Sequence, residues 1–347
     1  MSRRAAVATG GHDVADAFVQ GQVETLVIDT DAAAESELAP KDRAGLSIAV
    51  LEDLAAGVFR ECCFSGCGYR LCRSTRAEAD SRGVDMTGNR LLAVVTGASS
   101  GIGFELARQL ALNGYGLVIA AEDKGIEEAA VELRTAGDGT VPVEAVRVDL
   151  ATAEGVQRLH TALATRAVHV AILNAGVGWG GAFVETELAA ELKMIDLNVS
   201  STVHLTKLLL RDMVADDEGR ILITSSIAST MPGSFQAVYN ATKSFLQSFA
   251  EALQEELEDS NVVVTSLMPG PTETNFFHRA RMDATPVGQA GKDDPAEVAR
   301  QGLAALMAGK DRQVAASLKT RAQELAAKMT PDKVKAAMHR KLAEPEE

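Results

Sequence analysis

The chain has 347 residues, 46% hydrophobic and 24% charged, enough for one large or two modest domains with a hydrophobic core. Its formal net charge is −14, and because an acidic surface repels phosphate backbones, the composition argues against nucleic-acid binding. No apolar run approaches the roughly 20 residues of a membrane helix, and no apolar stretch follows Arg3 and Arg4 as a signal peptide requires. We therefore expect a cytoplasmic protein with no membrane segment and no nucleic-acid partner.

Residues 1–85 form a leader whose pattern differs from the rest of the chain. A short helix is expected over 13–21 and a strand over 23–29, but the Ala-rich, polar segment 31–43 completes no core. The run from Asp13 to Asp29 resembles a helix–strand unit in the C-terminal domain of peptide-chain release factors, which would make the leader a fused translation-associated fragment. We favour a fusion scar or a start codon set upstream of Met86, with the folded domain spanning 86–347.

All four cysteines lie in this leader, at Cys62, Cys63, Cys67 and Cys72. Four thiolates could bind zinc, but structural zinc sites usually pair two short loops across a longer span. A reducing cytosol also disfavours disulfides. We predict unpaired thiols, no metal site and no thiol catalysis in the domain, and the six scattered histidines show no metal-binding spacing either.

From residue 86 onward, apolar runs alternate with helical patterns. The runs cover 91–96, 116–121, 141–148, 169–173, 220–224, 261–267 and 313–316, and the helical patterns include 104–112, 125–136, 188–214 and 239–258. Strands separated by helices indicate βαβ units, and near-continuous apolar strands indicate a sheet covered on both faces. The predicted fold is α/β: a Rossmann-type doubly wound parallel sheet of about seven strands flanked by helices, with a poorly structured N-terminal leader.

A glycine-rich turn follows the first of these strands. It reads Thr96-Gly97-Ala98-Ser99-Ser100-Gly101-Ile102-Gly103, and the helical pattern begins near Ile102. Glycines there let the backbone approach a pyrophosphate, and the helix N-terminus supplies free N–H groups. Alone, the spacing G-x3-G-x-G would also suit a plain strand-to-helix turn.

Polar residues that end the third and fourth strands strengthen the signal. Val148-Asp149-Leu150 ends the third strand, where a carboxylate could accept a hydrogen bond from an adenine amine, and Asn174-Ala175-Gly176 ends the fourth. Both fall at the carboxyl edge of the predicted sheet, where open α/β sheets bind ligands.

Further motifs follow in order: Asn198, Ser226, and then Tyr239 and Lys243, whose i, i+4 spacing puts them on one helix face. Together with the turn, Asp149, Asn174-Ala175-Gly176 and the loop Pro269-Gly270-Pro271-Thr272-Glu273-Thr274, they resemble the short-chain dehydrogenase/reductases over about 91–316. One departure is Leu173, where that family commonly has a second asparagine, and it need not affect the chemistry. The resemblance implies NAD(P)-dependent hydride transfer between a carbonyl and a secondary alcohol.

The preference for NAD or NADP depends on the residues at the end of the second strand, which read Ala120-Ala121-Glu122-Asp123. A carboxylate there binds the ribose hydroxyls and repels a 2′-phosphate, so Glu122 and the uncharged Ser100 favour NAD, whereas Lys124 leaves NADP open. The cofactor-binding residues that we expect are Gly97, Ser99, Ser100, Gly101, Ile102, Gly103, Glu122, Asp149, Leu150, Asn174, Ala175, Gly176, Tyr239, Lys243, Pro269, Gly270, Thr272 and Thr274.

Four residues are the expected catalytic group. A phenol with a pKa near 10 is a poor base, but the adjacent Lys243 ammonium and the charge of an oxidised nicotinamide would favour the Tyr239 phenolate. Tyr239 would then be the acid in reduction and the base in oxidation, and Ser226 would bind the substrate oxygen. The resemblance further implies that Lys243 binds the nicotinamide ribose, that Asn198 holds a relay water, and that Thr272 and Thr274 hold the carboxamide.

The sequence indicates less about the substrate than about the cofactor. Val177, Trp179, Ile227, Phe235 and Gln236, with a lid over about 275–294, would line a largely apolar pocket. A hydrophobic ketone or secondary alcohol fits such a pocket, and a carrier-bound 3-oxoacyl group remains an alternative.

The C-terminal segment over about 318–347 has helical spacing, and we expect a solvated or oligomer-packing helix there. By resemblance, the helical patterns over 188–214 and 239–258 would pair subunits in a homodimer or homotetramer. The alternative function is a cofactor-binding regulatory protein without turnover. The presence of Asn198, Ser226, Tyr239 and Lys243 together argues against it.

Overall fold

The computed structural model describes residues 6–7, 25–27, 61–65, 68–71, 83–84, 88–137, 139–164, 166–315 and 332–344. The chain divides into two units, Met1–Ser81 and Arg82–Glu347. The second unit holds every motif described above except the cysteines and the release-factor-like segment.

The first unit contains a four-stranded sheet in the order β1 (Ala6–Val7), β2 (Thr25–Val27), β3 (Glu61–Ser65) and β4 (Gly68–Leu71). The β1–β2 pair is parallel, and the β2–β3 and β3–β4 pairs are antiparallel. Strand β2 falls inside the predicted strand, whereas the β3–β4 hairpin, with Cys62 and Cys63 on β3, has no counterpart in the sequence prediction. The predicted helix over 13–21, Cys67 and Cys72 lie outside the described residues.

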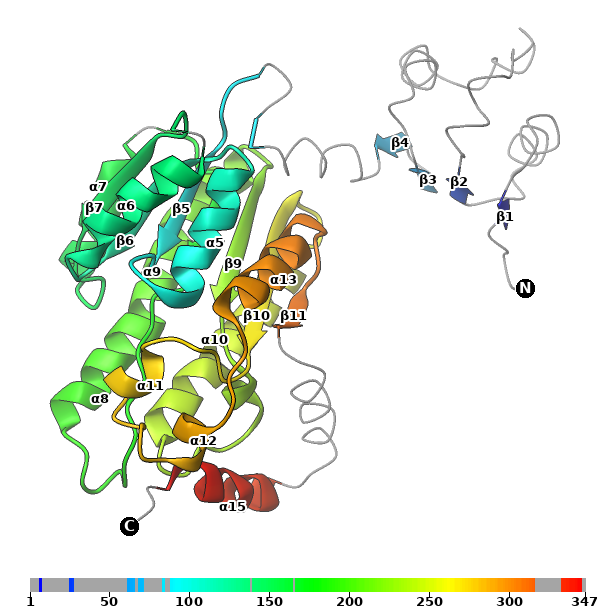
Figure 1. The fold of residues 1–347 in the computed structure, drawn as a ribbon. Coiled ribbons are helices and arrows are strands. Elements are labelled where there is room, and N and C mark those ends of the chain that lie inside the picture. Colours follow the sequence, from blue (N-terminus) through cyan, green and yellow to red (C-terminus); the bar gives the residue numbers. More distant parts are fainter. Residues whose placement is uncertain are drawn as a thin grey trace, which may run out of the picture. The chain divides into compact units, whose positions relative to one another are not determined.

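The second unit is built on a seven-stranded sheet in the order β11-β10-β9-β8-β5-β6-β7, in which all neighbours are parallel (Figure 1). The strands are β5 (Leu92–Thr96), β6 (Gly116–Ala121), β7 (Val143–Arg147), β8 (Val170–Leu173), β9 (Gly219–Thr224), β10 (Val262–Pro269) and β11 (Arg312–Ala315). β6, β8 and β10 are buried throughout, as near-continuous apolar runs require. The doubly wound fold that the sequence predicts is confirmed.

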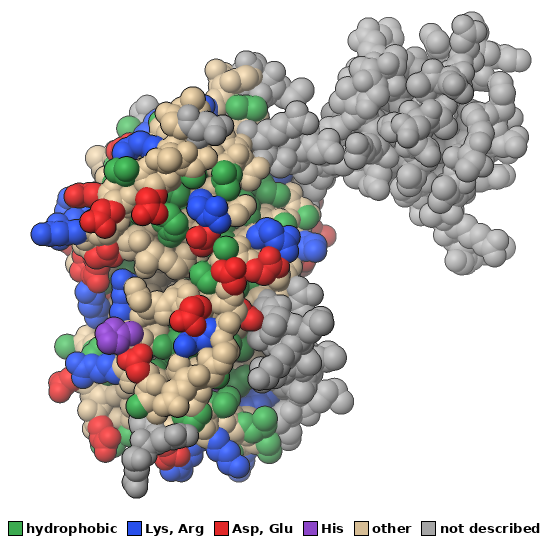
Figure 2. Space-filling model, in the orientation of Figure 1, with side chains coloured by type: hydrophobic (Ala, Val, Ile, Leu, Met, Phe, Trp, Pro, Cys, Tyr) green, Lys and Arg blue, Asp and Glu red, His purple; other side chains and the backbone are tan. Residues whose placement is uncertain are grey.

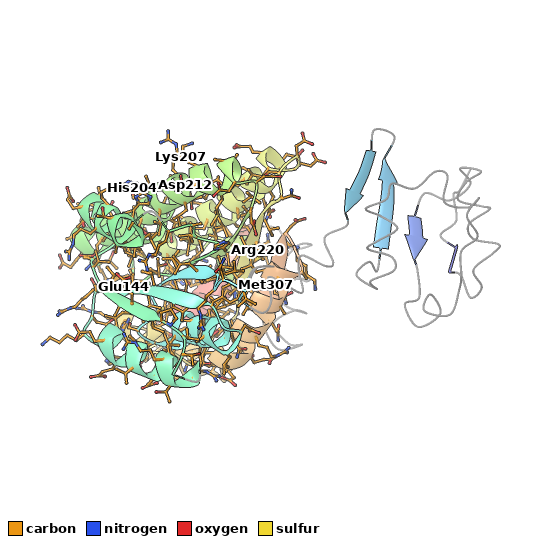
Figure 3. The ribbon with its side chains drawn as sticks, turned by 90° about the horizontal axis from the view of Figure 1, so that it is seen from above. Glu144, His204, Lys207, Asp212, Arg220 and Met307 are labelled. Atoms are coloured by element: carbon orange, nitrogen blue, oxygen red, sulfur yellow. The ribbon has the colours of Figure 1, made fainter. Side chains whose placement is uncertain are left out.

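Helices cover both faces of this sheet and bury two separate apolar clusters. One face carries α5 (Gly101–Leu112), α6 (Gly125–Ala136) and α13 (Pro295–Met307), and the other carries α7 (Ala153–Leu163), α9 (Ser201–Ala215) and α10 (Ala237–Glu256). Seen from above in Figure 3, Lys207 and Asp212 of α9 lie on the outer side of the molecule, away from the sheet. The order of strands reverses between β8 and β5, so the ligand site of such a fold is expected at the carboxyl ends of these two strands.

The predicted helix over 188–214 is interrupted. The structure has α8 (Leu188–Ile195), a π-helical turn η2 (Asp196–Ser200) and then α9. Such turns are rare and occur frequently at functional sites. Asn198 lies within η2 and is fully buried.

Short elements at the carboxyl edge complete the unit. They are η3 (Ile227–Thr230), α11 (Phe276–Arg279), α12 (Pro286–Gln289) and, at the end of the chain, α15 (Asp332–Ala343). α11 and α12 lie within the predicted lid segment. On the face that Figure 2 shows, acidic and basic side chains are interspersed over the described surface. In the described part of the chain, no helix has the length and apolarity to cross a membrane, and no cluster of potential metal ligands is found.

The start of the second unit allows a test of the domain boundary. The Leu91 amide donates to the Gly83 carbonyl at 2.9 Å, and Val84 bridges Arg90. A chain that starts at Arg82 should therefore match the full chain in melting temperature and kcat/KM. A chain that starts at Met86 should keep its activity but lose about 1 kcal/mol and a few degrees. Calorimetry and steady-state assays of the three chains compare them, and a large loss of activity in the Arg82 chain would contradict this boundary.

Candidate active site

The glycine-rich turn between β5 and α5 forms a tight backbone cradle. Gly97 and Gly101 have φ values of +69° and +60°, which favour glycine. A Cβ on Gly103 would lie 2.2 Å from the Gly97 carbonyl oxygen, so the turn closes only with glycine there. Ser100, the residue before α5, makes no side-chain cap, and the first N–H groups of the helix are therefore not capped by it. This arrangement could hold a pyrophosphate, and Ser99, Ser100, Gly101 and Ile102 line the cavity at this point.

Asn174 connects the ends of three neighbouring strands beside this turn. Its side-chain amide donates to the Thr96 carbonyl at 3.3 Å, and its Oδ1 accepts from the Thr224 hydroxyl at 3.2 Å. The backbone amides of Asn174 and Ala175 both donate to Thr96 Oγ1 at 3.0 Å. These bonds fix the loop that begins at Gly176 over the strand-order reversal.

Carboxylates at the ends of β6 and β7 have different surroundings. Asp123 accepts from the Ser99 hydroxyl at 2.8 Å and from the Gly125 amide at 2.9 Å, so it secures the turn. Glu122 and Asp149 line the cavity. Lys193 of α8 reaches both of them, with Nζ 3.0 Å from Glu122 Oε2 and 3.8 Å from Asp149 Oδ2. Lys193 was not among the predicted site residues, because no local sequence pattern indicates that α8 comes close to these strands.

The predicted catalytic side chains lie together at the other end of the cavity. Tyr239 and Lys243 are buried on α10, and the Lys243 ammonium lies 5.9 Å from the centre of the Tyr239 ring. Lys243 Nζ donates to the Thr224 carbonyl at 2.8 Å, which holds it under the end of β9. Ser226, just before η3, accepts from the Ala228 amide at 3.1 Å and hydrogen-bonds the Tyr239 phenol.

The titration of this pair differs from the sequence expectation. Burial raises the pKa of Tyr239 to about 12, and the hydrogen bond with Ser226 offsets only part of that rise. Burial also lowers the pKa of Lys243 to about 8. In the protein without a cofactor, burial therefore keeps the phenol pKa above its ordinary value.

Asn198 has a fully engaged side chain. Its Oδ1 accepts from the Val177 amide at 2.9 Å, and its Nδ2 donates to the Val177 carbonyl at 2.9 Å and to Thr242 Oγ1 at 3.0 Å. The π-helical turn therefore ties the loop after β8 to α10, one residue before Lys243.

One continuous cavity of about 550 Å³ joins these groups, within the usual size range of ligand sites. Of the predicted cofactor residues it is lined by all except Gly103, which lies beneath the turn. Asn198 also lies outside the lining. Val177, Ile227 and Gln236 line the cavity, as do lid residues and five residues of α15, which are Lys335, Met338, His339, Leu342 and Ala343.

Two expected substrate residues have other contacts. The Trp179 ring lies under the Arg281 guanidinium at 4.5 Å, and the Phe235 ring lies under that of Arg340 at 5.7 Å, and neither ring lines the cavity. Helix α15 also packs one face on the site, which the sequence analysis did not predict, while Val334, Met338 and Leu342 stay about half exposed. The pairing of this helix with another subunit stays a prediction.

A doubly wound parallel sheet with a glycine cradle at its strand-order reversal defines a dinucleotide-binding protein of the Rossmann type. A family model described as short chain dehydrogenase matches residues 91–285, more than half of the chain. The chain belongs to this family. The predicted family is thereby confirmed.

Individual relatives agree with this membership. The mouse (Mus musculus) dehydrogenase/reductase SDR family member 7B is 32% identical over 212 residues, 60% of this chain and 64% of that protein. The match thus spans less than two thirds of that relative's length. A short-chain dehydrogenase from Sphingobium yanoikuyae in complex with NADPH has 26% identity and a TM-score of 0.62, covering 69% of this chain and 93% of that one. A short chain dehydrogenase/reductase from Burkholderia phymatum in complex with NAD has 26% identity and a TM-score of 0.62, and the match covers 68% of this chain and 92% of that one.

Proposed function

We propose that the protein interconverts a hydrophobic ketone and its secondary alcohol by NAD(P)-dependent hydride transfer. The observation that carries the proposal is the convergence of Ser226, Tyr239 and Lys243 on one end of the cavity whose other end is the glycine cradle. The dinucleotide, when bound, supplies or accepts the hydride at the carbonyl carbon. The protein supplies the proton, so ketone, hydride and one proton give the alcohol.

Each residue has a distinct part in this proposal. Ser226 and the Tyr239 hydroxyl hydrogen-bond the substrate oxygen, and Tyr239 gives up its proton as charge develops there. The Lys243 ammonium stabilises the resulting phenolate and would bind the nicotinamide ribose. Asn198 positions the Val177 loop and α10, and by family resemblance holds the relay water. Thr272 and Thr274, which line the cavity, would hold the carboxamide.

A tracer experiment tests this reaction directly. Reduced cofactor deuterated at nicotinamide C4 is incubated with the protein and a hydrophobic methyl ketone, and the alcohol is analysed by mass spectrometry. We expect one deuterium on the carbinol carbon, transferred from one face of the cofactor only. Deuterium lost to solvent, or an unlabelled alcohol, would contradict direct hydride transfer.

The pKa values predict how ketone reduction depends on pH. Tyr239, with a pKa of about 12, remains protonated and able to donate throughout the neutral range. Lys243 loses its charge as the pH rises through about 8, and with it the stabilisation of the phenolate. The value of kcat/KM for reduction should therefore be flat below pH 7 and fall above about pH 8. In Lys243→Arg the guanidinium does not titrate there, so the fall near pH 8 should disappear, and its persistence would assign that step to another group.

The preference for NAD is a further proposal, supported by Glu122 in the cavity lining. Glu122→Arg should shift the ratio of kcat/KM toward NADP by about tenfold or more, because ribose hydrogen bonds are lost and a 2′-phosphate partner is gained. Lys124→Ala, which alters a side chain outside the lining, is the matched control and should change the ratio little. A wild type that already prefers NADP would contradict the assignment and make Lys193, which reaches Glu122, the candidate phosphate partner.

We also infer a homodimer or homotetramer. Exposed apolar side chains on the helical segments over 188–214 and 239–258 support it. Leu188, Leu192 and Ile195 of α8 and Phe245 of α10 are large hydrophobic side chains with 37–66% of their surface exposed. They lie on the two helical segments that the family resemblance assigns to subunit pairing. A cytoplasmic location stays a prediction from the sequence.

A further inference from the structure

Helix α15 is anchored on the loop between β9 and α10, next to the catalytic residues. The Lys335 ammonium donates to the Thr230 carbonyl at 3.2 Å, and the Ser234 hydroxyl donates to the Ala336 carbonyl at 3.1 Å. Near the other end of the helix, Ala343 is 1% exposed and packs into the apolar cluster of the lid. These contacts join α15 both to the loop that leads into α10 and to the lid.

The cavity extends from the catalytic tyrosine toward α15. The Phe276 ring of the lid lies 5.3 Å from the Tyr239 ring, centre to centre, and Phe276 also packs against the cluster that contains Ala343. Val287, Met338 and Leu342 line the cavity as well, and all three are apolar. A substrate whose carbonyl lies at Tyr239 would therefore extend along an apolar wall formed by the lid and by α15.

His339 is one of two polar residues of α15 on this wall, and the other, Lys335, is bonded to the Thr230 carbonyl. The side chain of His339 lines the cavity, and the residue is only 6% exposed. Nδ1 lies 2.9 Å from the Ser234 carbonyl oxygen. Because a carbonyl oxygen only accepts, Nδ1 must carry the proton, and in a neutral ring Nε2 is then an acceptor.

The ring is neutral at physiological pH, since burial lowers the pKa of His339 against the opposing effect of the Ser234 hydrogen bond. Among the described residues, none hydrogen-bonds Nε2. Nε2 is therefore an acceptor open to a ligand's donor, and a ligand that brings a donor to this position gains a hydrogen bond that a ligand without one does not.

We propose that α15 forms the distal wall of the substrate pocket and that His339 is a specificity-determining residue, whose Nε2 accepts a hydrogen bond from a hydroxyl or amide N–H on the substrate's tail. The inference rests on the proposed function and narrows it. The substrate class becomes a ketone or alcohol with an apolar middle and a donor-bearing end remote from the reacting carbon. The neutral His339 ring donates its one N–H to the Ser234 carbonyl, so it has no donor left for a substrate tail that carries only hydrogen-bond acceptors.

A matched series of methyl ketones tests the assignment. The ketones increase in chain length and end in either a hydroxyl or a methyl group. For the wild type, one chain length should show kcat/KM about three- to tenfold higher for the hydroxyl end, the worth of one hydrogen bond. His339→Phe should abolish that preference, mainly through KM. His339→Gln, which retains an acceptor, should restore part of it.

Controls separate this inference from the proposed function. Lys341→Ala changes an exposed side chain of the same helix outside the lining and should leave the preference intact. Turnover of the methyl-ended ketones without a hydroxyl preference at any length would overturn the role of His339 and leave the proposed function standing. If no ketone is turned over, the proposed function fails. Calorimetry then gives the Kd of each diol and of the matching methyl-ended alcohol, for the wild type and for His339→Phe. If the ratio of these two Kd values is the same in both proteins, the pocket assignment is overturned.

Discussion

Tyr239→Phe is expected to lower kcat for ketone reduction by about 10³-fold or more while cofactor affinity stays near that of the wild type. The variant loses the proton donor, which typically contributes 10²–10⁴-fold, and part of the alignment of the substrate oxygen. The ring itself, packed 5.3 Å from Phe276, is retained. Stopped-flow turnover and a fluorescence titration of the reduced cofactor measure the two quantities separately.

A second tyrosine provides the matched control. Tyr115 is fully buried and lies outside the cavity lining, so Tyr115→Phe should leave kcat unchanged. Near-native turnover in Tyr239→Phe would show that the proton donor is another group. A large loss of cofactor affinity would show that the variant disturbs the site and not only its chemistry.

Gly103→Ala is the second change with a large expected effect. In an exposed helix a Gly→Ala replacement would stabilise by up to about 1 kcal/mol, but here the new methyl would lie 2.2 Å from the Gly97 carbonyl oxygen and 2.5 Å from Asn174 Nδ2. These close contacts can be relieved only if the backbone of the glycine-rich turn moves apart. We expect a loss of about 1–3 kcal/mol in stability and a weakening of cofactor binding by about tenfold or more.

Calorimetry gives the melting temperature, and a titration well below it gives the Kd. Gly302→Ala in α13 is the control, because its methyl would meet only the Leu267 side chain, at 3.0 Å, and should not alter cofactor affinity. Wild-type affinity in Gly103→Ala would mean that the turn is not the pyrophosphate site.

The sheet could be predicted from the sequence because its strands are buried on both faces. The apolar runs over 91–96 and 116–121 match β5 and β6 to within a residue, and the same holds for the start of β8. The convergence of Ser226, Tyr239 and Lys243 on one cavity could be predicted from motif order, since the carboxyl ends of parallel strands meet at one edge.

Other features depend on contacts between distant segments and left no local pattern. Lys193 reaches Glu122 across 71 positions of sequence, and His339 meets Ser234 across 105. The helical spacing around 318–342 predicted a helix but not which surface it would cover. The apolar character of Trp179 and Phe235 suggested a pocket wall, yet each packs under an arginine instead.

The measurement that tests the central claim most directly is the initial rate of change in nicotinamide absorbance with the purified protein, a panel of ketones and alcohols and both cofactors. The account predicts turnover of at least one hydrophobic ketone or secondary alcohol that disappears in Tyr239→Phe and persists in Tyr115→Phe. Tight cofactor binding with no turnover of any member of the panel would contradict it and would favour a regulatory protein that binds the dinucleotide without using it.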